Sequence, residues 1–249
     1  MNAALETKGL QKTFGALVVA DSINFRLEKG VRHALIGPNG AGKTTFVNLL
    51  TGRLKPSSGN VLLDGHDITR QPPAERVKSG LGRTFQINAL FNDLSVLDNV
   101  CLAVAERMGT GYGWWRPASA YSEVIGEATA LLDSLGLAND RKKYVRDLPY
   151  GKQRLVEIAI ALGLRPNVLL LDEPAAGVPS HESHIIFDVL ERLPGEISIL
   201  FIEHDMDLVF RFASRITVLS AGAMLAEGTP TEIKENPIVR NVYLGESHV

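Results

Sequence analysis

The chain has 249 residues, of which 45% are hydrophobic and 22% are charged, and its formal net charge is −2. These values are ordinary for a soluble globular protein and give no electrostatic reason to expect a nucleic-acid partner. The single cysteine, Cys101, excludes an intrachain disulfide framework. No apolar run approaches the roughly 18 residues of a membrane helix, and the N-terminal residues lack a signal-peptide pattern, so we expect a cytoplasmic protein that reaches a membrane only through a partner.

Short apolar, β-branched runs alternate with helical patterns along the chain, which indicates an α/β fold. Residues up to Glu28 are expected to form short strands of an antiparallel sheet beside a parallel core. The stretch "VRHALIG" (31–37) has a strand pattern, and "KTTFVNLLTG" (43–52) has a helical pattern that ends at its last glycine. The stretch "GNVLLDGHDI" (59–68) predicts a strand that ends in an Asp-Gly turn.

The middle of the chain has a different pattern. From Leu94 to Gly163 it is mostly helical, which predicts a helical subdomain inserted into a single domain of residues 1–249. The stretch "GTGYGWWRPASAY" (109–121) interrupts this pattern and is expected to be an irregular, exposed excursion. Its Trp114 and Trp115 would either form a partner-binding patch or pack the excursion onto its own subdomain.

The last third contains further strand patterns. The stretches "NVLLLDEP" (167–174) and "ISILFIEH" (197–204) are apolar at almost every position, as strands covered on both faces of a parallel sheet must be. "RITVLSAGAMLAEGTP" (215–230) predicts two strands around a tight turn at Ala221-Gly222. The core sheet is therefore predicted to be mostly parallel.

The stretch "GPNGAGKT" (Gly37–Thr44) matches the phosphate-binding pattern GxxxxGK[ST] between a strand and a helix. Its glycines allow backbone N–H groups to converge on phosphate oxygens, and the helix directs its positive end at the same anion. Lys43 is expected to neutralise the terminal phosphates, and Thr44 to offer its hydroxyl to Mg²⁺. The predicted nucleotide contacts here are Gly37, Pro38, Asn39, Gly40, Ala41, Gly42, Lys43, Thr44 and Thr45.

Polar side chains end the later strands. Asp172 closes a buried strand, where a carboxylate is costly without a cation, and is predicted to hold Mg²⁺ through water. Glu173 follows it and is expected to polarise the attacking water. His204 ends the next strand and should lie beside these carboxylates in a doubly wound sheet. Gln86, in "GRTFQ", ends another short strand and is expected to sense the γ-phosphate, the metal and the water.

The stretch "LPYGKQRLVEIAIALGL" (148–164) places Gly151 and polar residues before an apolar helical face formed by Leu155, Ile158, Ala159 and Leu162. Taken alone, the polar start has two interpretations. It is either a loop-to-helix junction with solvated charges or an anion site beside a helix N-terminus.

The segments "GPNGAGKTT", "RTFQ", "LPYGKQR", "VLLLDEPAAG" and "EHD" occur in this order and resemble the ATP-binding subunit of ABC transporters over nearly the whole chain. Within that family, "FVNLLTG", "GRTFQ", "IEHDMDLV" and the ending "NPIVRNVYLGE" resemble the ATPases of branched-chain amino acid importers. The resemblance implies a P-loop ABC ATPase core and two subunits that close face to face around two ATP molecules. "LPYGKQR" would then contact, through Gly151, Lys152 and Gln153, the γ-phosphate of ATP held by the opposite subunit.

The chain departs from the family pattern at several positions. Pro149 replaces the usual serine of the signature, Tyr150 its first glycine and Lys152 its first glutamine, whereas Gly151 is kept. Pro179 stands in the loop after the carboxylates, where the family has an aspartate or an asparagine that couples the two sites, and Gly177 and Ser180 are the candidate substitutes for that contact. Phe14, in "KTFG", matches the aromatic residue that stacks on adenine in the family.

These features predict a transport ATPase that uses ATP and Mg²⁺ at the cytoplasmic face of the membrane. The expected partners are two permease subunits, an identical or related second ATPase and, indirectly, an extracytoplasmic solute-binding protein. The ATPase of a lipopolysaccharide export system is an alternative, as are a soluble ABC protein of translation or DNA repair and a non-catalytic regulatory module. The cargo, branched-chain or related amino acids, is implied by the resemblance alone.

Overall fold

The computed structural model describes residues 3–84, 90–110 and 118–244, which form two compact units. The first unit comprises residues 1–81, 167–173 and 194–249. The second comprises residues 82–166 and 174–193.

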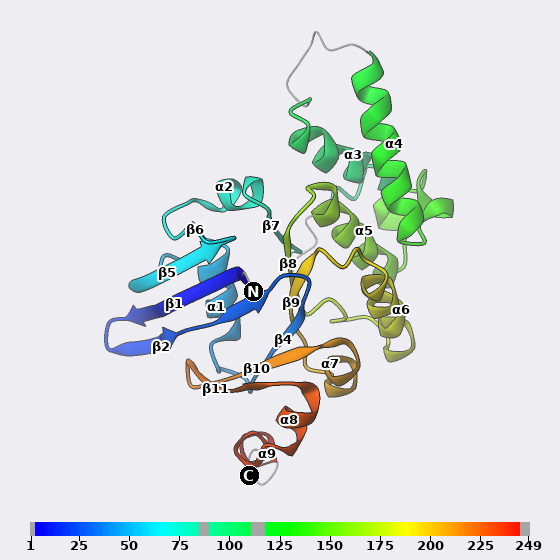
Figure 1. Cartoon of the computed structure of the whole chain (residues 1–249). Coiled ribbons are helices and arrows are strands. Elements are labelled where there is room, and N and C mark those ends of the chain that lie inside the picture. Colours follow the sequence, from blue (N-terminus) through cyan, green and yellow to red (C-terminus); the bar gives the residue numbers. More distant parts are fainter. Residues whose placement is uncertain (1–2, 85–89, 111–117, 245–249) are drawn as a thin grey trace. The chain divides into compact units, whose positions relative to one another are not determined.

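The first unit contains an antiparallel sheet in the order β2-β1-β5-β6 (Figure 1). In addition, β3 pairs with β1. Its strands are β1 (Ala3–Phe14), β2 (Leu17–Ile23), β3 (Arg26–Glu28), β5 (Ser58–Leu63) and β6 (His66–Asp67). The expected antiparallel sheet is thus confirmed. The Asp64-Gly65 turn is also confirmed, with φ of 48° and 82°, and it joins β5 to β6 as a hairpin.

The second sheet has the order β11-β10-β4-β9-β8-β7. The strands β10, β4, β9 and β8 run parallel, whereas β11 is antiparallel to β10. Every residue of β8 and β9 is buried, which agrees with their apolar sequences. The strands are β4 (Arg32–Ile36), β7 (Leu81–Arg83), β8 (Val168–Asp172), β9 (Ser198–Ile202), β10 (Arg215–Ser220) and β11 (Ala223–Gly228).

The two sheets and one helix of the first unit share an apolar core. This core contains Leu5 and Leu10 of β1, Phe46 of the helix, and Leu170 and Leu200 of the parallel sheet. The helices of this unit are α1 (Lys43–Leu50), α2 (Pro73–Lys78), α7 (Met206–Phe212), α8 (Pro230–Glu235) and α9 (Pro237–Leu244). Within the described ranges, none of the helices combines the length and apolar character that a membrane crossing requires.

A buried arginine caps the C-terminal end of α1. Arg76, only 1% exposed, donates hydrogen bonds to the carbonyl oxygens of Leu49 at 2.8 Å and Leu50 at 2.6 Å. It also donates to those of Thr69 at 2.8 Å and Gln71 at 3.0 Å. A cation at this end of a helix satisfies unpaired carbonyl groups and opposes the negative pole of the helix dipole. The helix that follows the phosphate loop is therefore anchored at its far end.

The second unit is helical. Contacts join α3 to α4 and α5, α4 to α5, and α5 to α6. Its helices are α3 (Val96–Arg107), α4 (Ala118–Ser134), α5 (Tyr150–Gly163) and α6 (Ser180–Glu191), with 3₁₀ turns at Ala138–Asp140 and Val145–Asp147. The predicted subdomain of residues 94–163 lies within this unit, and its separate status stays a prediction. Trp114 and Trp115 lie outside the described residues, so neither interpretation of them is tested.

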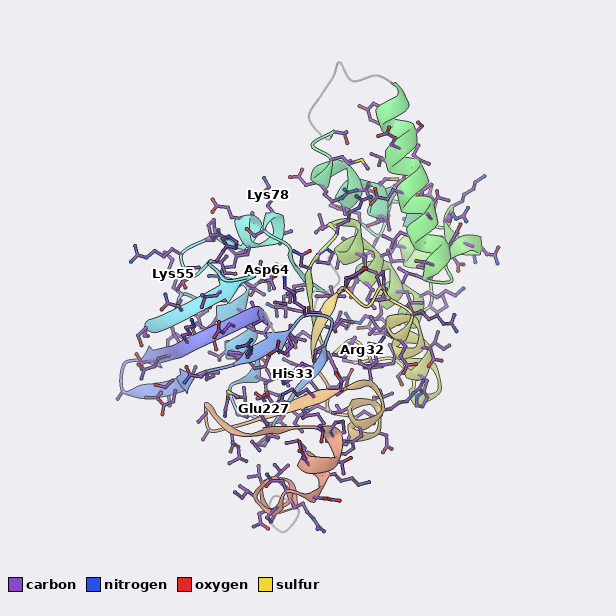
Figure 2. All side chains as sticks on the ribbon, in the orientation of Figure 1. Arg32, His33, Lys55, Asp64, Lys78 and Glu227 are labelled. Carbon is purple, nitrogen blue, oxygen red and sulfur yellow. The ribbon has the colours of Figure 1, made fainter. Side chains whose placement is uncertain are left out.

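A buried histidine joins two strands of the parallel sheet. His33 on β4 is fully buried, its Nε2 lies 2.8 Å from Thr217 Oγ1, and its ring centroid lies 4.9 Å from that of Phe25 (Figure 2). The Thr217 hydroxyl donates to Glu227 at 3.2 Å, so His33 donates its Nε2–H to Thr217. Burial, together with the positive charge of Arg215, lowers the pKa of His33 from 6.5 to about 3. The ring is therefore neutral in the folded protein.

This depressed pKa makes folding stability sensitive to acid. In the unfolded chain His33 takes up a proton near pH 6.5, whereas in the folded protein it does so only near pH 3, so its contribution to stability is lost as pH falls through that window. At pH 5 the loss is about 2 kcal/mol. We expect His33→Gln to flatten the fall in urea-unfolding free energy between pH 6.5 and 4.5, whereas His66→Gln, at an exposed position, should keep it. An unaltered slope in His33→Gln would contradict this assignment.

Candidate functional site

Three parallel strands of the first unit end at the same level. In the register of the sheet, Leu35 of β4 and Asp172 of β8 both pair with Ile202 of β9. The loops that follow these strands therefore begin next to one another at the carboxyl edge, where open α/β sheets bind their ligands. The predicted site residues after β4, β8 and β9 are thus brought together.

The loop between β4 and α1 passes close to its surroundings at two glycines. A Cβ atom at Gly37 would lie 2.3 Å from the carbonyl oxygen of Leu219, and one at Gly42 would lie 2.8 Å from that of Val19. Gly42 also has a φ of 99°, in the left-handed region that favours glycine. Neither position accepts a side chain without displacement of backbone, so both glycines of the phosphate-binding pattern are required by the packing of the loop.

The lysine of the pattern lies inside its own loop. Lys43 begins α1 and is 8% exposed, and its Nζ donates to the carbonyl oxygens of Gly37 at 2.6 Å and Pro38 at 3.0 Å. Burial lowers the pKa of Lys43, although the negative charges of Glu173 and Asp172 oppose this shift. Among the other predicted contacts, Asn39, Gly40 and Thr44 are exposed, Pro38, Gly42 and Thr45 are half-buried, and Gly37 and Ala41 are buried.

Two carboxylates follow one another at the end of β8. Asp172 is 3% exposed, and Glu173 adopts a φ of 51° while its N–H donates to the carbonyl oxygen of Ile202 at 3.0 Å. Positive φ is unfavourable for glutamate, and such strain gathers at functional sites. His204 Nε2 lies 2.9 Å from Glu173 Oε1, which confirms the expectation that this histidine lies beside the carboxylates. The contact with His204 fixes the Oε1 atom of the Glu173 carboxylate.

The aromatic residue predicted to stack on adenine lies on a hairpin that contacts the phosphate loop. Phe14 ends β1, is 54% exposed and pairs with Leu17 of β2. The Nζ of Lys12 lies 4.9 Å from the centre of its ring. Further along β2, the carbonyl oxygen of Val19 is the atom that approaches Gly42. Phe14 thus stands exposed on a strand pair fixed against the loop.

The polar start of the signature stretch lies in the second unit. The helix α5 begins at Tyr150, earlier than the apolar pattern from Leu155 indicated, so Gly151, Lys152 and Gln153 all lie in its first turns. The side chain of Gln153 donates to the carbonyl oxygen of Leu148 at 3.0 Å. The polar side chains of Lys152 and Gln153 are half-buried and have partners within the unit, and neither interpretation of the segment is tested by these contacts.

Lys152 has such a partner. Its Nζ lies 2.6 Å from Oδ2 of Asp140, whose other oxygen lies 2.7 Å from the Nζ of Lys143. Asp140 is 1% exposed. Burial alone would raise the pKa of its carboxyl group, but the hydrogen bonds and charges of the two lysines lower it overall. The role of Lys152 as a nucleotide ligand stays a prediction, and it requires this ion pair to open. Gln86 lies outside the described residues.

The sequence patterns missed two contacts in the second unit. The ring of Tyr150 lies against Gly177, and Arg154 forms a buried ion pair with Glu157 at 2.7 Å. The i,i+3 spacing of the ion pair was the available signal. The contact between Tyr150 and Gly177 had none, because it joins residues 27 positions apart in sequence.

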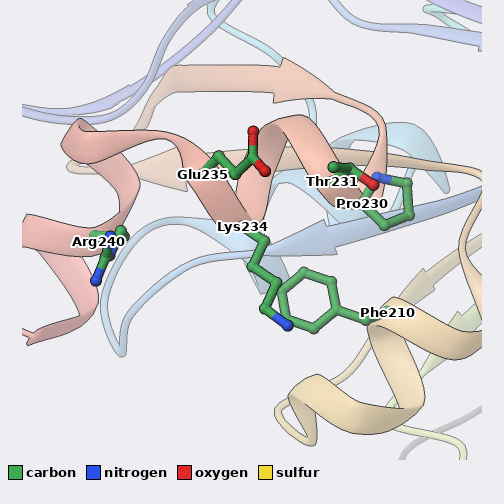
Figure 3. Close-up of a pocket in the computed structure, with 6 residues that line it drawn as sticks. All are labelled: Phe210, Pro230, Thr231, Lys234, Glu235 and Arg240. Atoms are coloured by element: carbon green, nitrogen blue, oxygen red, sulfur yellow. The ribbon is translucent and has the colours of Figure 1, made fainter.

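A hollow of about 840 Å³ lies away from the phosphate loop, among the C-terminal helices of the first unit (Figure 3). The ammonium group of Lys234 lies 5.9 Å from the ring centre of Phe210, whereas Arg240 stands apart from them. The polar groups that line this hollow do not converge on one point, so we do not assign the hollow as the functional site. Its lining residues are Phe210, Pro230, Thr231, Lys234, Glu235 and Arg240.

Known proteins resemble the chain over nearly its full length. Residues 20–176 match the family described as ABC transporter, and residues 223–249 match the family described as branched-chain amino acid ATP-binding cassette transporter. The high-affinity branched-chain amino acid transport ATP-binding proteins BraF of Pseudomonas aeruginosa and LivG of Escherichia coli are each 38% identical to it, over 98% of both chains.

Solved structures agree with this likeness. The ADP conformation of an ATP-binding cassette of an ABC transporter has a TM-score of 0.85 and 33% identity, and covers 98% of this chain and 99% of that one. A dimeric post-hydrolysis state of an ATP-binding cassette bound to ADP and Pi has a TM-score of 0.75 and 25% identity, and covers 91% of this chain and 98% of that one. The α/β fold with its antiparallel sheet and mostly parallel core is that of these cassettes. The chain therefore belongs to the ABC transporter family as an ATP-binding subunit, a class whose general function is ATP hydrolysis coupled to transport.

Proposed function

We propose that this chain hydrolyses ATP to power an importer for branched-chain or related amino acids. The observation that carries the proposal is the strained Glu173, held by His204 at the edge of the sheet where the phosphate loop begins. A carboxylate at this point can accept a proton from water and direct the water at a γ-phosphate bound in the loop. The named relatives support the choice of cargo.

The site residues of the first unit then have the following roles. Lys43 gives up its contacts with the loop carbonyls and neutralises the β- and γ-phosphates, while Phe14 offers its exposed ring to the adenine. His204 keeps Glu173 oriented through its Oε1 atom. The second oxygen of Glu173 is left for the water. The loop amides from Gly37 onward bind the phosphate oxygens.

The residues also fit Mg²⁺. Among the described residues no group of three or more acidic, histidine or cysteine side chains could hold a metal on its own. Mg²⁺ needs no such group, because it commonly takes one carboxylate, water and substrate phosphates. The buried carboxylate of Asp172 and the exposed hydroxyl of Thr44 supply oxygen ligands of this kind, and Gln86 is the predicted third. The ion would neutralise charge that develops on the phosphates.

The proposal includes a second ATPase subunit, identical or related, since a dimer is the form of one structural relative. Gly151, Lys152 and Gln153 of each subunit would contact the γ-phosphate held by the other. ATP binding would then close the pair, and hydrolysis would reopen it. Two permease subunits at the cytoplasmic face of the membrane would receive this motion, and an extracytoplasmic binding protein would deliver the cargo.

A co-purification from native membranes tests this function. We expect the tagged chain, extracted in mild detergent, to bring two polytopic permeases and a second small ATPase. In proteoliposomes this complex should hydrolyse ATP several-fold faster when its binding protein and leucine, isoleucine or valine are present. The same complex with Glu173→Gln is the control and should stay inactive. Recovery of lipid-export components, or of a wholly soluble protein with ribosomes or DNA, would contradict the importer.

A further inference from the structure

The tyrosine that begins α5 lies against the loop that follows Glu173 in sequence. Tyr150 is 37% exposed, and a Cβ atom at Gly177 would lie 3.1 Å from its Cε1, 3.5 Å from its Cζ and 3.6 Å from its Oη. The phenol edge of the ring therefore rests on the bare Cα of Gly177. Gly177 has a φ of 76°, a backbone conformation that favours glycine over residues with a side chain.

The ring is held from within its own helix. One helical turn along α5, the guanidinium carbon of Arg154 lies 5.0 Å from the ring centre of Tyr150. Arg154 is itself 5% exposed and forms its ion pair with Glu157, which is 6% exposed. A buried cation fixed by a buried carboxylate forms a rigid base for the ring. Tyr150 is thus set between Arg154 and Gly177.

A second contact orients the same helical turn. Lys152 ties the start of α5 to Asp140, in the 3₁₀ turn Ala138–Asp140. Because Tyr150 and Lys152 flank Gly151 in sequence, both neighbours of that glycine are engaged inside the unit. Tyr150 and Lys152, two of the three departures from the usual signature residues, therefore act on the position of the turn that carries Gly151.

The loop that Tyr150 contacts joins the carboxylates to the next helix. Gly177 comes four residues after Glu173 and two before Pro179, which precedes the first residue of α6. The N–H of Val178 donates to the carbonyl oxygen of Ala175 at 3.1 Å, so this short loop has a turn of its own. If the first turn of α5 moves, the ring of Tyr150 moves with it and displaces this loop at Gly177.

We propose that Tyr150 is a positioning residue that couples the signature turn around Gly151 to residues 174–179. Within one subunit, this ring contact joins the turn that carries Gly151 to the loop that carries Gly177 and Pro179. The expected effect on ATP turnover rests on the proposed function. The contact between α5 and residues 174–179 is independent of that function. The contact transmits the position of the signature turn to the segment that continues from Glu173.

Hydrogen exchange of the full chain tests the link without reference to activity. In Tyr150→Ser we expect the amide of Val178 to exchange about tenfold faster, because its loop loses the ring contact at the neighbouring Gly177. Tyr150→Phe should remain within about twofold of the parent, since the ring remains. Tyr144→Ser is the matched control, because Tyr144 is 47% exposed and carries the guanidinium of Arg146 at 4.9 Å, whereas the three atoms nearest to a Cβ at Gly177 all belong to Tyr150. It should leave Val178 unchanged.

Unchanged exchange at Val178 in Tyr150→Ser would overturn the proposal. Tyr150→Leu keeps part of the apolar contact and should give an intermediate rate, so it replaces Tyr150→Ser if the latter does not fold.

In the assembled transporter, Tyr150→Ser should lower kcat about tenfold with little change in KM for ATP, because coupling and not ATP binding is lost. Faster exchange with normal kcat would overturn the coupling role, and an inactive parent complex would count against the proposed function alone.

Discussion

Replacing Glu173 by Gln is expected to reduce ATP turnover by at least about a hundredfold and to leave ATP binding intact. Glutamine fills the same volume at the end of β8 and can still meet His204, but its amide cannot accept a proton from water. ATP would therefore bind and close the two subunits without being hydrolysed. Turnover is measured as phosphate release, and dimerisation as a shift in mass on size exclusion with ATP.

An exposed acidic residue in the first turn of α7 gives the control for this substitution. Asp207→Asn removes one negative charge close in sequence to His204 and should keep the activity of the parent protein. Near-normal ATPase activity in Glu173→Gln would refute the role of Glu173. Loss of ATP-dependent dimerisation together with activity would mean that Glu173 supports binding as well as chemistry.

Replacing Lys43 by Ala is expected to weaken ATP binding about 10- to 100-fold, which corresponds to the loss of one hydrogen-bonded charge contact. The substitution removes the phosphate contact and also the two hydrogen bonds to the carbonyl oxygens of Gly37 and Pro38. Binding is measured by fluorescence titration with a labelled nucleotide. Lys43→Ala therefore lowers the affinity for ATP, whereas Glu173→Gln lowers the rate of ATP turnover.

Lys78→Ala provides a comparison of equal charge, because Lys78 is an exposed lysine on α2 (Figure 2). It should bind ATP as the parent does. If Lys43→Ala bound ATP normally, the assignment of residues 37–44 as a phosphate loop would be wrong.

Elements whose chemistry is local are recognisable in the amino-acid sequence. A phosphate loop is one contiguous stretch, so its glycines, Lys43 and Thr44 are recognisable from spacing alone. The apolar runs of β8 and β9, the Ala221-Gly222 turn and the antiparallel N-terminal strands follow from residue types within a few positions of one another. These patterns also sufficed to identify the family before any tertiary contact was known.

Which distant side chains meet depends on long-range packing. Glu173 reaches His204 because β8 and β9 are neighbours in a fixed parallel register, and that register is set by the packing of the whole sheet. The partner of Lys152 was open in the sequence, since a flexible side chain can point to a nucleotide or to a carboxylate, and the fold places Asp140 within its reach. In the sequence Tyr150 is only a departure from a pattern, and the fold brings its ring against Gly177, 27 positions away. Local sequence patterns identify the catalytic and binding residues, whereas long-range packing determines how their side chains are oriented.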